Sequence, residues 1–317
     1  MRTITALFVG LGSIGTRHLK NLANLCADRG WTLQADALRS DLTRPLRPGA
    51  AELLHAQYTD LTAAPAHYDM VFITNPTSLH AEALRQVKGR GEALFIEKPI
   101  FSAEQTGLAL DELLPAGQKA YVAAPMRWCG AMLALKDRLP ALHPYCVRVI
   151  CSSYLPDWRP GVDYRTVYSA RKALGGGVTI DLIHEWDYLV ELFGVPEKLY
   201  NFKGTYSELE IDSDDLSVYI AKYPTLLAEV HLDYFGRGYR RSIELFCRDG
   251  SYLADFGKGT LTLPDGTVQH YEEDVNRRYE REMEYFVDYA LTGCGESCNP
   301  PALALKVLKL TLGENVQ

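Results

Sequence analysis

The sequence predicts an α/β protein in two parts: a doubly wound parallel domain, then an α+β domain with a large, mostly antiparallel sheet. Up to about residue 123, short apolar runs alternate with longer amphipathic runs. Further along, single apolar and polar residues alternate within runs that turn residues join. A chain of 317 residues is long enough for two ordinary domains or one large one. Strands and helices that take turns need crossover connections, which produce a parallel sheet covered on both faces.

The elements of the first part follow one another as strand and helix. The expected strands are TALFVG (5–10), TLQADAL (32–38), DMVFITN (69–75), ALFIEKP (93–99) and KAYVAAP (119–125). Helices are expected from about Ile14, near residues 50–56, from about Ser78 and from Ala103. Residues 1–123 are therefore expected to form the first domain.

The second part has the period of strands with one face in water. Its expected strands are PYCVRVICSSYL (144–155), DDLSVYIAKY (214–223), LLAEVHLDYF (226–235), RRSIELFCRDG (240–250) and SYLADF (251–256). We assign residues 124–298 to this domain. A final helix within 299–317 follows Pro300 and Pro301, and it is expected to pack back on the first domain.

Composition excludes several classes of function. The chain is 47% hydrophobic and 23% charged, as in ordinary soluble proteins, and its net charge of −7 offers no footprint for a nucleic-acid backbone. No run approaches the roughly 18 apolar residues of a membrane span. The seven cysteines are odd in number and scattered, which indicates free thiols in a reducing cytoplasm. Cys294 and Cys298 lack a second pair of ligands, so no metal is expected.

A glycine-rich stretch, VGLGSIGTRH, follows the first expected strand. Gly10, Gly12 and Gly15 have the G-x-G-x-x-G spacing, with Ser13 and Ile14 at the start of the helix. The first glycine permits a tight turn, the second lets a pyrophosphate approach the backbone, and the third lets the helix pack on the sheet. Within a strand-helix-strand unit, this pattern predicts dinucleotide binding.

The stretch LFIEKPI (94–100) ends an apolar strand on two charges. Glu97 and Lys98 stand side by side before Pro99, which has no N–H for a sheet and ends or bends the strand. Lys98 is therefore expected at a strand's carboxyl end. By itself, the stretch is also consistent with a solvated strand end.

A helix is expected from about Val178 in LGGGVTIDLIHEWDYLVELFG (174–194). Its apolar stripe would contain Leu182, Ile183, Trp186, Leu189, Val190 and Phe193, and its polar face Asp181, His184, Tyr188 and Glu191. Asp181 and His184 are three residues apart, so their side chains can meet on a helix. The polar face is either solvated or lines a cleft in which a carboxylate orients a proton-transferring imidazole.

Taken together, these segments resemble the Gfo/Idh/MocA oxidoreductases, named for glucose-fructose oxidoreductase and inositol dehydrogenase. The resemblance extends in order over most of the chain: GLGSIGTRH, TNPTSLHAE (74–82), EKP (97–99), MRW (126–128), the three glycines before Asp181 and His184, and RRSIELFCRDGSYLADF (240–256). It implies a Rossmann domain, an α+β domain whose open sheet often forms an oligomer interface, and a nicotinamide cofactor. It also implies hydride transfer at a secondary alcohol of a sugar or cyclitol.

The resemblance also implies roles for individual residues. Lys98 would contact the reacting oxygen, and Asp181 and His184 would complete the catalytic group. Asn75, Pro76, Thr77 and His80 would lie along the cofactor, with Glu97 and Lys98 beside it, and Arg127 and Trp128 near the substrate. Family members usually have the histidine four residues after the aspartate rather than three. If His184 is turned away, Lys98 itself is the acid and base.

Two functions agree with these features. The first is an NAD(P)-dependent oxidoreductase acting on a sugar, sugar acid or cyclitol; the alternative is a sensor that binds dinucleotide without chemistry. Loop 154–177 carries Trp158, Arg159, Tyr164 and Arg165 among its aromatic and cationic residues. Such side chains suit a sugar ring that bears a carboxylate or phosphate, although an interface loop would have the same composition.

The second expected strand and its exit, TLQADALRSD (32–41), bear on the choice of cofactor. An acidic residue at the tip would bind the ribose of NAD, but the tip falls on Leu38 or Arg39. Asp36 lies too early and Asp41 lies beyond the turn. The cations Arg39 and Arg44, with Ser40, suit a 2′-phosphate and favour NADP over NAD, unless Arg39 stacks on the adenine instead.

The second sheet is also expected to mediate assembly. Helices must cover one face of it; if the other face also carries Tyr219, Tyr223, Tyr234 and Tyr239, that face is rich in aromatic residues. A surface rich in aromatic residues is typical of interfaces, although scattered exposed tyrosine is common. The sequence thus predicts a homodimer or homotetramer.

Overall fold

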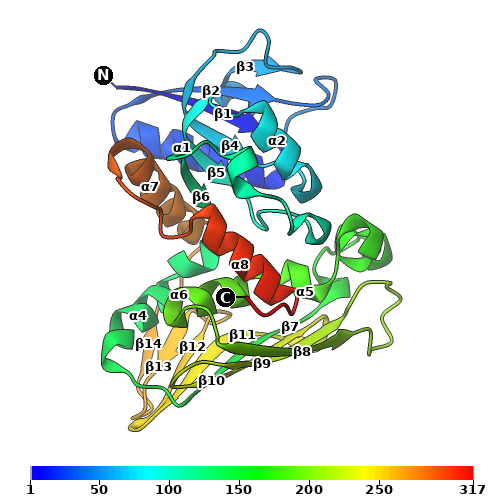
Figure 1. Ribbon diagram of the computed structural model, residues 1–317, viewed down its shortest axis with the longest axis vertical. Helices are drawn as coiled ribbons and strands as arrows, with labels where there is room; N and C mark the ends of the chain where they lie inside the picture. Colours follow the sequence, from blue (N-terminus) through cyan, green and yellow to red (C-terminus); the bar gives the residue numbers. More distant parts are fainter. Residues whose placement is uncertain (1, 317) are drawn as a thin grey trace. The chain divides into compact units, whose positions relative to one another are not determined.

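The computed structural model describes residues 2–316, and the chain divides into two compact units (Figure 1). The first unit extends to Ala123 and also includes Tyr279–Leu305. The second comprises Ala124–Arg278 and the residues from Lys306 onward. A parallel sheet in one unit and a mostly antiparallel sheet in the other confirm the predicted fold class.

The first unit is built on a six-stranded sheet in which every neighbouring pair is parallel. The strand order is β3-β2-β1-β4-β5-β6. The strands are β1 Thr3–Val9, β2 Thr32–Leu38, β3 Leu54–Tyr58, β4 Tyr68–Ile73, β5 Gly91–Ile96 and β6 Lys119–Val122. The order reverses between β1 and β4, and the carboxyl ends of strands at such a reversal are where ligands bind in open α/β sheets.

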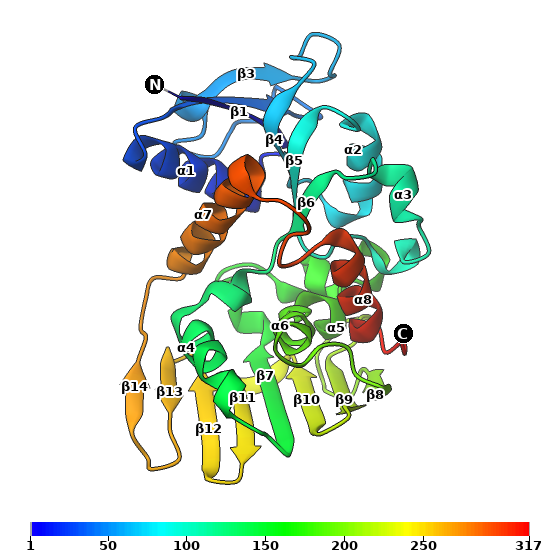
Figure 2. The same ribbon diagram turned by 60° about the vertical axis from the view of Figure 1, so that its left-hand side comes forward.

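Helices cover both faces of this sheet. Figure 2 shows α1 (Ser13–Asp28) and α7 (Asn276–Thr292) on one face, and α2 (His80–Gln86) and α3 (Leu110–Leu113) on the other. Helix α7 contributes Met283, Phe286, Val287 and Ala290 to the core of this unit. The predicted boundary had assigned this segment to the second domain, because nothing in its local sequence indicates which distant core its apolar stripe joins.

Two expected helices of the first unit are shorter or absent. Residues 50–56 form one 3₁₀ turn, Ala51–Leu53, and then enter β3. β3 pairs with β2 at the sheet edge and alternates between half-buried and exposed residues, which is the period of a strand and not of the expected helix. The helix expected from Ala103 is a 3₁₀ turn, Ala103–Gln105, which a capping box with Ser102 begins.

The second unit is built on an eight-stranded sheet of order β14-β13-β12-β11-β7-β10-β9-β8. Its strands are β7 Cys146–Tyr154, β8 Lys198–Gly204, β9 Leu216–Lys222, β10 Leu227–Asp233, β11 Phe235–Cys247, β12 Gly250–Asp255, β13 Thr260–Thr262 and β14 Val268–His270. β7 and β10 are parallel, and the other neighbouring pairs are antiparallel. Strands β8, β13 and β14 were not expected from the sequence.

Helices of the second unit lie along one face of its sheet, and the part of the unit that the structure describes leaves the other face bare (Figures 1 and 2). These helices are α4 Gly130–Arg138, α5 Val178–Asp181 and α6 His184–Phe193; α8 (Pro301–Thr311) begins in the first unit and ends in the second.

Three of the four tyrosines considered for the bare face are buried. Tyr219, Tyr223 and Tyr234 are buried, and the ring of Tyr219 packs edge-on against Trp186 of α6 at 5.2 Å. Tyr239 is 59% exposed. The expected aromatic surface is therefore wrong for three of its four residues. Alternation in a strand shows which residues share a face, but it does not show which face the helices cover.

Candidate active site

The glycine loop lies at the reversal of strand order in the first sheet. Gly10 has φ +88°, and a Cβ built there would lie 2.8 Å from the Cα of Asn75, which follows β4. A Cβ on Gly15 would lie 2.6 Å from both the Gly10 carbonyl oxygen and Thr74 Oγ1. These two glycines therefore permit close packing between the loop, its helix and the end of β4.

The N-terminus of α1 is open to an anion. Its N-cap is Gly12, which is exposed, no side chain caps the helix and its first turn contains no acidic residue. A Cβ built on Gly12 would meet no atom within 4 Å. Ser13 is exposed and Ile14 is half-buried. Free backbone N–H groups at a helix N-terminus bind phosphate, so this loop fits the pyrophosphate of a dinucleotide.

Both aspartates near the second strand have hydrogen-bond partners inside the protein. Asp36 is buried, accepts a hydrogen bond of 2.8 Å from the Tyr68 hydroxyl, and lies 3.2 Å from His55 Nδ1. Asp41 accepts hydrogen bonds from the backbone and side chain of Thr43 at 2.8 and 2.6 Å. These bonds hold the pKa of Asp41 below its ordinary value.

Arg39 follows β2 and borders a surface pocket of about 440 Å³. Its Nη1 donates to Gln57 Oε1 at 2.7 Å, and its Nη2 donates to the carbonyl oxygen of Arg44 at 2.5 Å. Arg44 and Arg47 line the same pocket. The exposed Ser40 comes next in the chain after Arg39.

His80 fixes two loops at the carboxyl edge of the first sheet. Its ring is buried, with Nδ1 3.1 Å from the Ile100 carbonyl oxygen and Nε2 3.0 Å from the Asn75 carbonyl oxygen. Burial lowers the pKa of His80, although both carbonyl contacts oppose that shift. Backbone carbonyls face both ring nitrogens, so the expected place of His80 along the cofactor stays a prediction. The neighbouring Pro76 is exposed and Thr77 is half-buried, so this part of the segment is open to a ligand.

Lys98 is half-buried immediately after β5, at the same sheet edge as the glycine loop. The preceding Glu97 is buried; its Oε2 accepts the Lys98 backbone N–H at 3.0 Å, and its Oε1 lies 2.6 Å from His18 Nε2. The Lys98–Pro99 peptide bond is cis. Glu97 was expected beside the cofactor, but these contacts turn its carboxylate toward α1.

In the second unit, the continuous helix expected from Val178 is two helices. α5 ends at Asp181 and α6 begins at His184, so the two residues do not share one helix. The predicted polar face is also wrong at Tyr188, which is buried, and two charged residues outside that face, Glu185 and Asp187, are buried as well. Charged partners make that burial possible, as in the bidentate pair of Glu185 with Arg241 at 2.7 and 3.0 Å.

Two tyrosines hold the Asp181 carboxylate. The Tyr168 hydroxyl donates to Oδ1 at 2.6 Å, and the Tyr234 hydroxyl donates to Oδ2 at 2.5 Å. Burial and the neighbouring carboxylate raise the pKa of both tyrosines, so they remain protonated donors. The ring of Trp158 meets Tyr234 edge-on at 5.2 Å, and its Nε1 donates to Ser153 Oγ.

These tyrosines were missed as site residues. Tyr168 lies in loop 154–177, ten residues after Trp158. The aromatic and cationic composition of that loop was the sequence feature that could have identified Tyr168 as a site residue. Tyr234 had been assigned to the opposite face of the sheet. The cluster of Asp181, Tyr168, Tyr234 and Trp158 offers an anchored carboxylate beside aromatic rings, the kind of lining that ligand pockets have.

Other expected substrate residues hold the loop together. Arg165 makes bonds of 2.9 Å to each oxygen of Asp163 and to Glu210, and these raise its pKa. The Tyr164 hydroxyl accepts the Glu210 backbone N–H at 3.2 Å. An anionic substrate would have to displace these carboxylates from Arg165. Arg159 is exposed, and Trp128 is half-buried.

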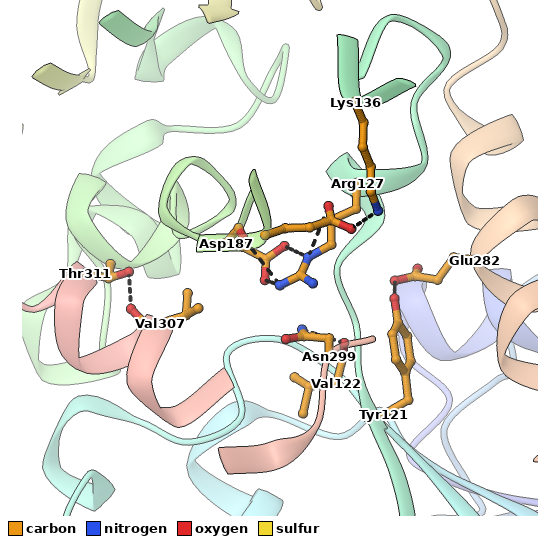
Figure 3. Close-up of polar contacts among 10 residues, drawn as sticks. Tyr121, Val122, Arg127, Lys136, Asp187, Glu282, Asn299, Val307 and Thr311 are labelled. Carbon is orange, nitrogen blue, oxygen red and sulfur yellow. Dashed lines mark hydrogen bonds and ion pairs between the residues drawn. The ribbon is translucent and has the colours of Figure 1, made fainter. Parts of the chain in front are cut away.

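Arg127, which was expected near the substrate, is buried and paired with a carboxylate. It lies in the 3₁₀ turn Pro125–Trp128, is 2% exposed, and binds Asp187 through Nε at 2.9 Å and Nη2 at 2.7 Å. Glu191 Oε2 lies 3.8 Å from its Nε, and Lys136 pairs with the other oxygen of Glu191. Figure 3 shows the guanidinium directed at Asp187. Its hydrogen-bonding edge is committed to carboxylates inside the protein.

Two features are absent from the part of the chain that the structure describes: a metal site and a membrane-spanning helix. Within residues 2–316, no group of three or more His, Cys, Asp or Glu side chains could hold a metal ion. No helix in this range combines the length and apolar character that a bilayer crossing needs.

Comparison with known proteins places these features in a family. Residues 4–123 match the model of the oxidoreductase family with an NAD-binding Rossmann fold, GFO_IDH_MocA. The chain is 24% identical over 308 residues to the uncharacterized oxidoreductase YrbE of Bacillus subtilis (strain 168), covering 90% of this chain and 86% of YrbE. It is 27% identical over 200 residues to the inositol 2-dehydrogenase of Rhizobium meliloti (strain 1021), covering 61% and 56% of the two chains.

The shared fold extends over both units. The structure of levoglucosan dehydrogenase in complex with NADH superposes with a TM-score of 0.81 at 16% identity, covering 98% of this chain and 96% of that one. At this identity the likeness establishes the fold alone. The match of residues 4–123 to the oxidoreductase family with an NAD-binding Rossmann fold, together with the relatives of 24% and 27% identity, supports the resemblance to the Gfo/Idh/MocA oxidoreductases.

Proposed function

We propose that this protein is an NAD(P)-dependent dehydrogenase that transfers hydride between nicotinamide and a secondary alcohol or ketone of a sugar, sugar acid or cyclitol. The observation that carries the proposal is the position of Lys98, directly after β5 at the sheet edge that also holds the open glycine loop. The relatives add support, since one is an inositol 2-dehydrogenase and a protein of the same fold is a levoglucosan dehydrogenase.

The residues of the first unit divide the work of binding and chemistry. The backbone N–H groups at the start of α1, from Gly12 onward, bind the pyrophosphate, and Asn75 to Thr77 border the same edge. When bound, the nicotinamide supplies the hydride donor or acceptor. Lys98 Nζ donates a hydrogen bond to the reacting oxygen and stabilises oxyanion character as the C–H bond breaks or forms.

The second unit supplies the proposed polar and aromatic contacts to the substrate. Asp181 is a carboxylate that two tyrosyl hydroxyls hold in place, so it accepts a substrate hydroxyl without reorganisation of its own. The apolar face of a sugar ring packs well on an aromatic side chain, which is the role we give to Trp158. Proton transfer falls to Lys98 or to His184, because each carries a titratable nitrogen.

The test is a change of nicotinamide absorbance when the purified protein is given NAD or NADP with a panel of sugars, cyclitols and sugar acids. We expect turnover on at least one member of the panel. Tight cofactor binding without turnover on any of them would contradict the proposal and favour a dinucleotide sensor.

For the cofactor, we propose NADP ahead of NAD. Asp36 is buried under Tyr68, and Oδ1 of Asp41 already accepts two hydrogen bonds from Thr43, so both are poor partners for a ribose hydroxyl. Arg39, Arg44 and Arg47 line one surface pocket after β2. Clustered guanidinium groups suit a dianionic phosphate.

Replacing Arg39 by Ala is expected to weaken NADPH by about 1.5–3 kcal/mol, the worth of a hydrogen bond to a charged group, and to affect NADH much less. Fluorescence titration of both cofactors measures the difference. Gln57→Ala is the matched control, because it removes the side-chain partner of Arg39 and keeps the cation. Equal losses for both cofactors would show that Arg39 stacks on the adenine instead.

We also propose a homodimer or homotetramer through the bare face of the second sheet. That face exposes apolar side chains in register: Tyr200 is paired with Ile220, and Phe202 with Val218. Tyr200, Phe202 and Ile220 are 51%, 72% and 37% exposed, and Leu227 on the next strand is 41% exposed. A contiguous exposed apolar surface of this kind marks an interaction site.

Light scattering at micromolar concentration is expected to give a mass of two or four chains. Phe202→Asp should shift it toward one chain by placing a charge in the buried interface, whereas Lys258→Asp, at an exposed lysine elsewhere in this unit, should leave the assembly unchanged. A monomeric wild-type protein would refute the assembly.

For localisation, we propose the cytoplasm. All seven cysteines are free thiols, including the exposed Cys294 and Cys298. Unpaired exposed thiols persist in reducing compartments.

A further inference from the structure

A buried contact between a histidine and a carboxylate lies behind the proposed catalytic lysine. His18, on the second turn of α1, is 0% exposed, and Glu97 is 7% exposed. Their contact, Nε2 to Oε1, measures 2.6 Å. The other oxygen of Glu97 accepts the backbone N–H of Lys98 at 3.0 Å. A short chain of contacts therefore runs from the glycine-loop helix through one carboxylate to the lysine.

Burying this pair removes a carboxylate from water, which a solvent-exposed strand end would not require. Taking a carboxylate out of water is unfavourable unless a partner compensates it. Burial raises the pKa of Glu97, but the contact with His18 and then the charge and backbone N–H of Lys98 more than offset this, and the net pKa lies below the ordinary value. His18 is thus the largest of the contacts that keep Glu97 ionised at neutral pH.

The His18 ring makes one polar contact, with Glu97, and is otherwise packed among aromatic rings. The ring packs against Phe95 at 4.7 Å and against Tyr279 at 6.1 Å. Among the described residues, Nδ1 has no hydrogen-bond partner. A buried imidazole that forgoes one hydrogen bond is poorly explained by packing alone, since an apolar residue would fill the same space without that loss.

A second histidine holds the other end of the lysine segment. The His80 ring lies between the carbonyl oxygens of Asn75 and Ile100, at 3.0 and 3.1 Å. The Asn75 backbone in turn packs on Gly10. Residues 97–100 are thus tied on one side to α1 and on the other to the loop after β4, and both of these border the proposed cofactor site.

We propose that His18 is a positioning residue for Lys98: through Glu97, it fixes the lysine segment to the helix that begins at the glycine loop. This role rests on the proposed function, in which Lys98 contacts the reacting oxygen. Helix α1 then serves twice, because its N-terminus receives the pyrophosphate and its second turn sets the position of the lysine. A displacement of about 1 Å in such a group can cost a factor of about 10² in rate.

Three variants at one position test the role. His18→Leu removes the contact with Glu97, His18→Asn is too short to reach it, and His18→Gln places an N–H donor at the reach of Nε2. We expect kcat to fall about 10²-fold in the Leu and Asn variants and to recover most of the way in the Gln variant, while KM and the Kd for reduced cofactor change little. Leu22→Ala, in the same buried helix face, is the control for stability loss without loss of the contact.

A cofactor-free measurement separates this role from the proposed function. An amine-reactive reagent, followed by mass spectrometry, gives the rate at which Lys98 is modified in the protein alone. We expect modification several-fold faster in His18→Asn than in wild type, with His18→Gln and Leu22→Ala close to wild type. This contrast stands even if no substrate turns over, so failure of the proposed function would be recognised separately.

The proposal has clear contrary outcomes. If His18→Leu folds and retains wild-type kcat, or if the Asn and Gln variants share one kcat and one Lys98 modification rate, His18 does not position the lysine. If His18→Leu fails to fold, the Asn and Gln pair decides.

Discussion

Replacing Lys98 by Met is expected to reduce kcat by at least about 10³-fold while leaving the Kd for reduced cofactor unchanged. Methionine keeps the unbranched apolar stem of lysine and loses the ammonium, and oxyanion stabilisation together with general acid–base catalysis is worth about that factor. Because the side chain extends from the end of β5 rather than from the glycine loop, the pyrophosphate site at α1 is untouched. Steady-state absorbance gives kcat, and cofactor fluorescence gives the Kd.

The control for this variant is Lys88→Met, an exposed lysine of the same unit that donates to the Glu112 carbonyl oxygen. It makes the same chemical change away from the sheet's carboxyl edge and should leave kcat within about twofold, as surface substitutions usually do. Full activity in Lys98→Met would remove the lysine from the mechanism. The dependence of the remaining kcat on pH would then show whether His184 moves the proton.

The features predicted best from the sequence are those that depend on local geometry. G-x-G-x-x-G after an apolar strand encodes a turn, a close approach and a helix start, and Gly10 and Gly15 occupy the crowded positions expected of them. Lys98 lies between the end of a buried strand and a proline that cannot continue the strand, so its place at the sheet edge also follows from local rules. No knowledge of distant residues was needed for either.

The features predicted poorly depend on partners far apart in the chain. The helical wheel assigned Glu185 and Asp187 to neither face; both are buried, and their partners Arg241 and Arg127 lie far away in the sequence. Alternation in β9 places Tyr219 correctly opposite Val218, but it does not decide which of the two faces the helices. Asp181 gains both of its tyrosyl donors from segments that a sequence pattern does not connect to it.

The break between α5 and α6 shows how such errors arise. The apolar stripe has a helical period throughout residues 178–194, which predicts one helix. The structure ends α5 at Asp181, and the side chain of Asp214 from outside the helix binds the backbone N–H and hydroxyl of Thr179. Periodicity is unaffected by a break of two residues, so a wheel cannot detect it.

Arg127→Met is expected to lower the free energy of unfolding by about 3–5 kcal/mol, the usual result of removing one partner from a buried ion pair. The change would leave the Asp187 carboxylate buried without its bidentate partner, and Glu191 would keep only Lys136. Denaturant unfolding followed by circular dichroism measures the loss. KM for substrate, measured at a temperature at which the variant is folded, should stay within about twofold because the guanidinium does not face solvent.

Lys136→Met is the matched control, since it makes a similar change at the exposed end of the same network. The Lys136 side chain is 46% exposed, against 1% for Arg127. Exposed pairs contribute at most about 1 kcal/mol, so this variant should unfold close to wild type. A substrate role for Arg127 makes the opposite prediction: wild-type stability with a raised KM in Arg127→Met. The two variants together therefore separate a residue that binds substrate from one that holds α6 to the turn at 125–128, and the burial of Asp187 favours the second role.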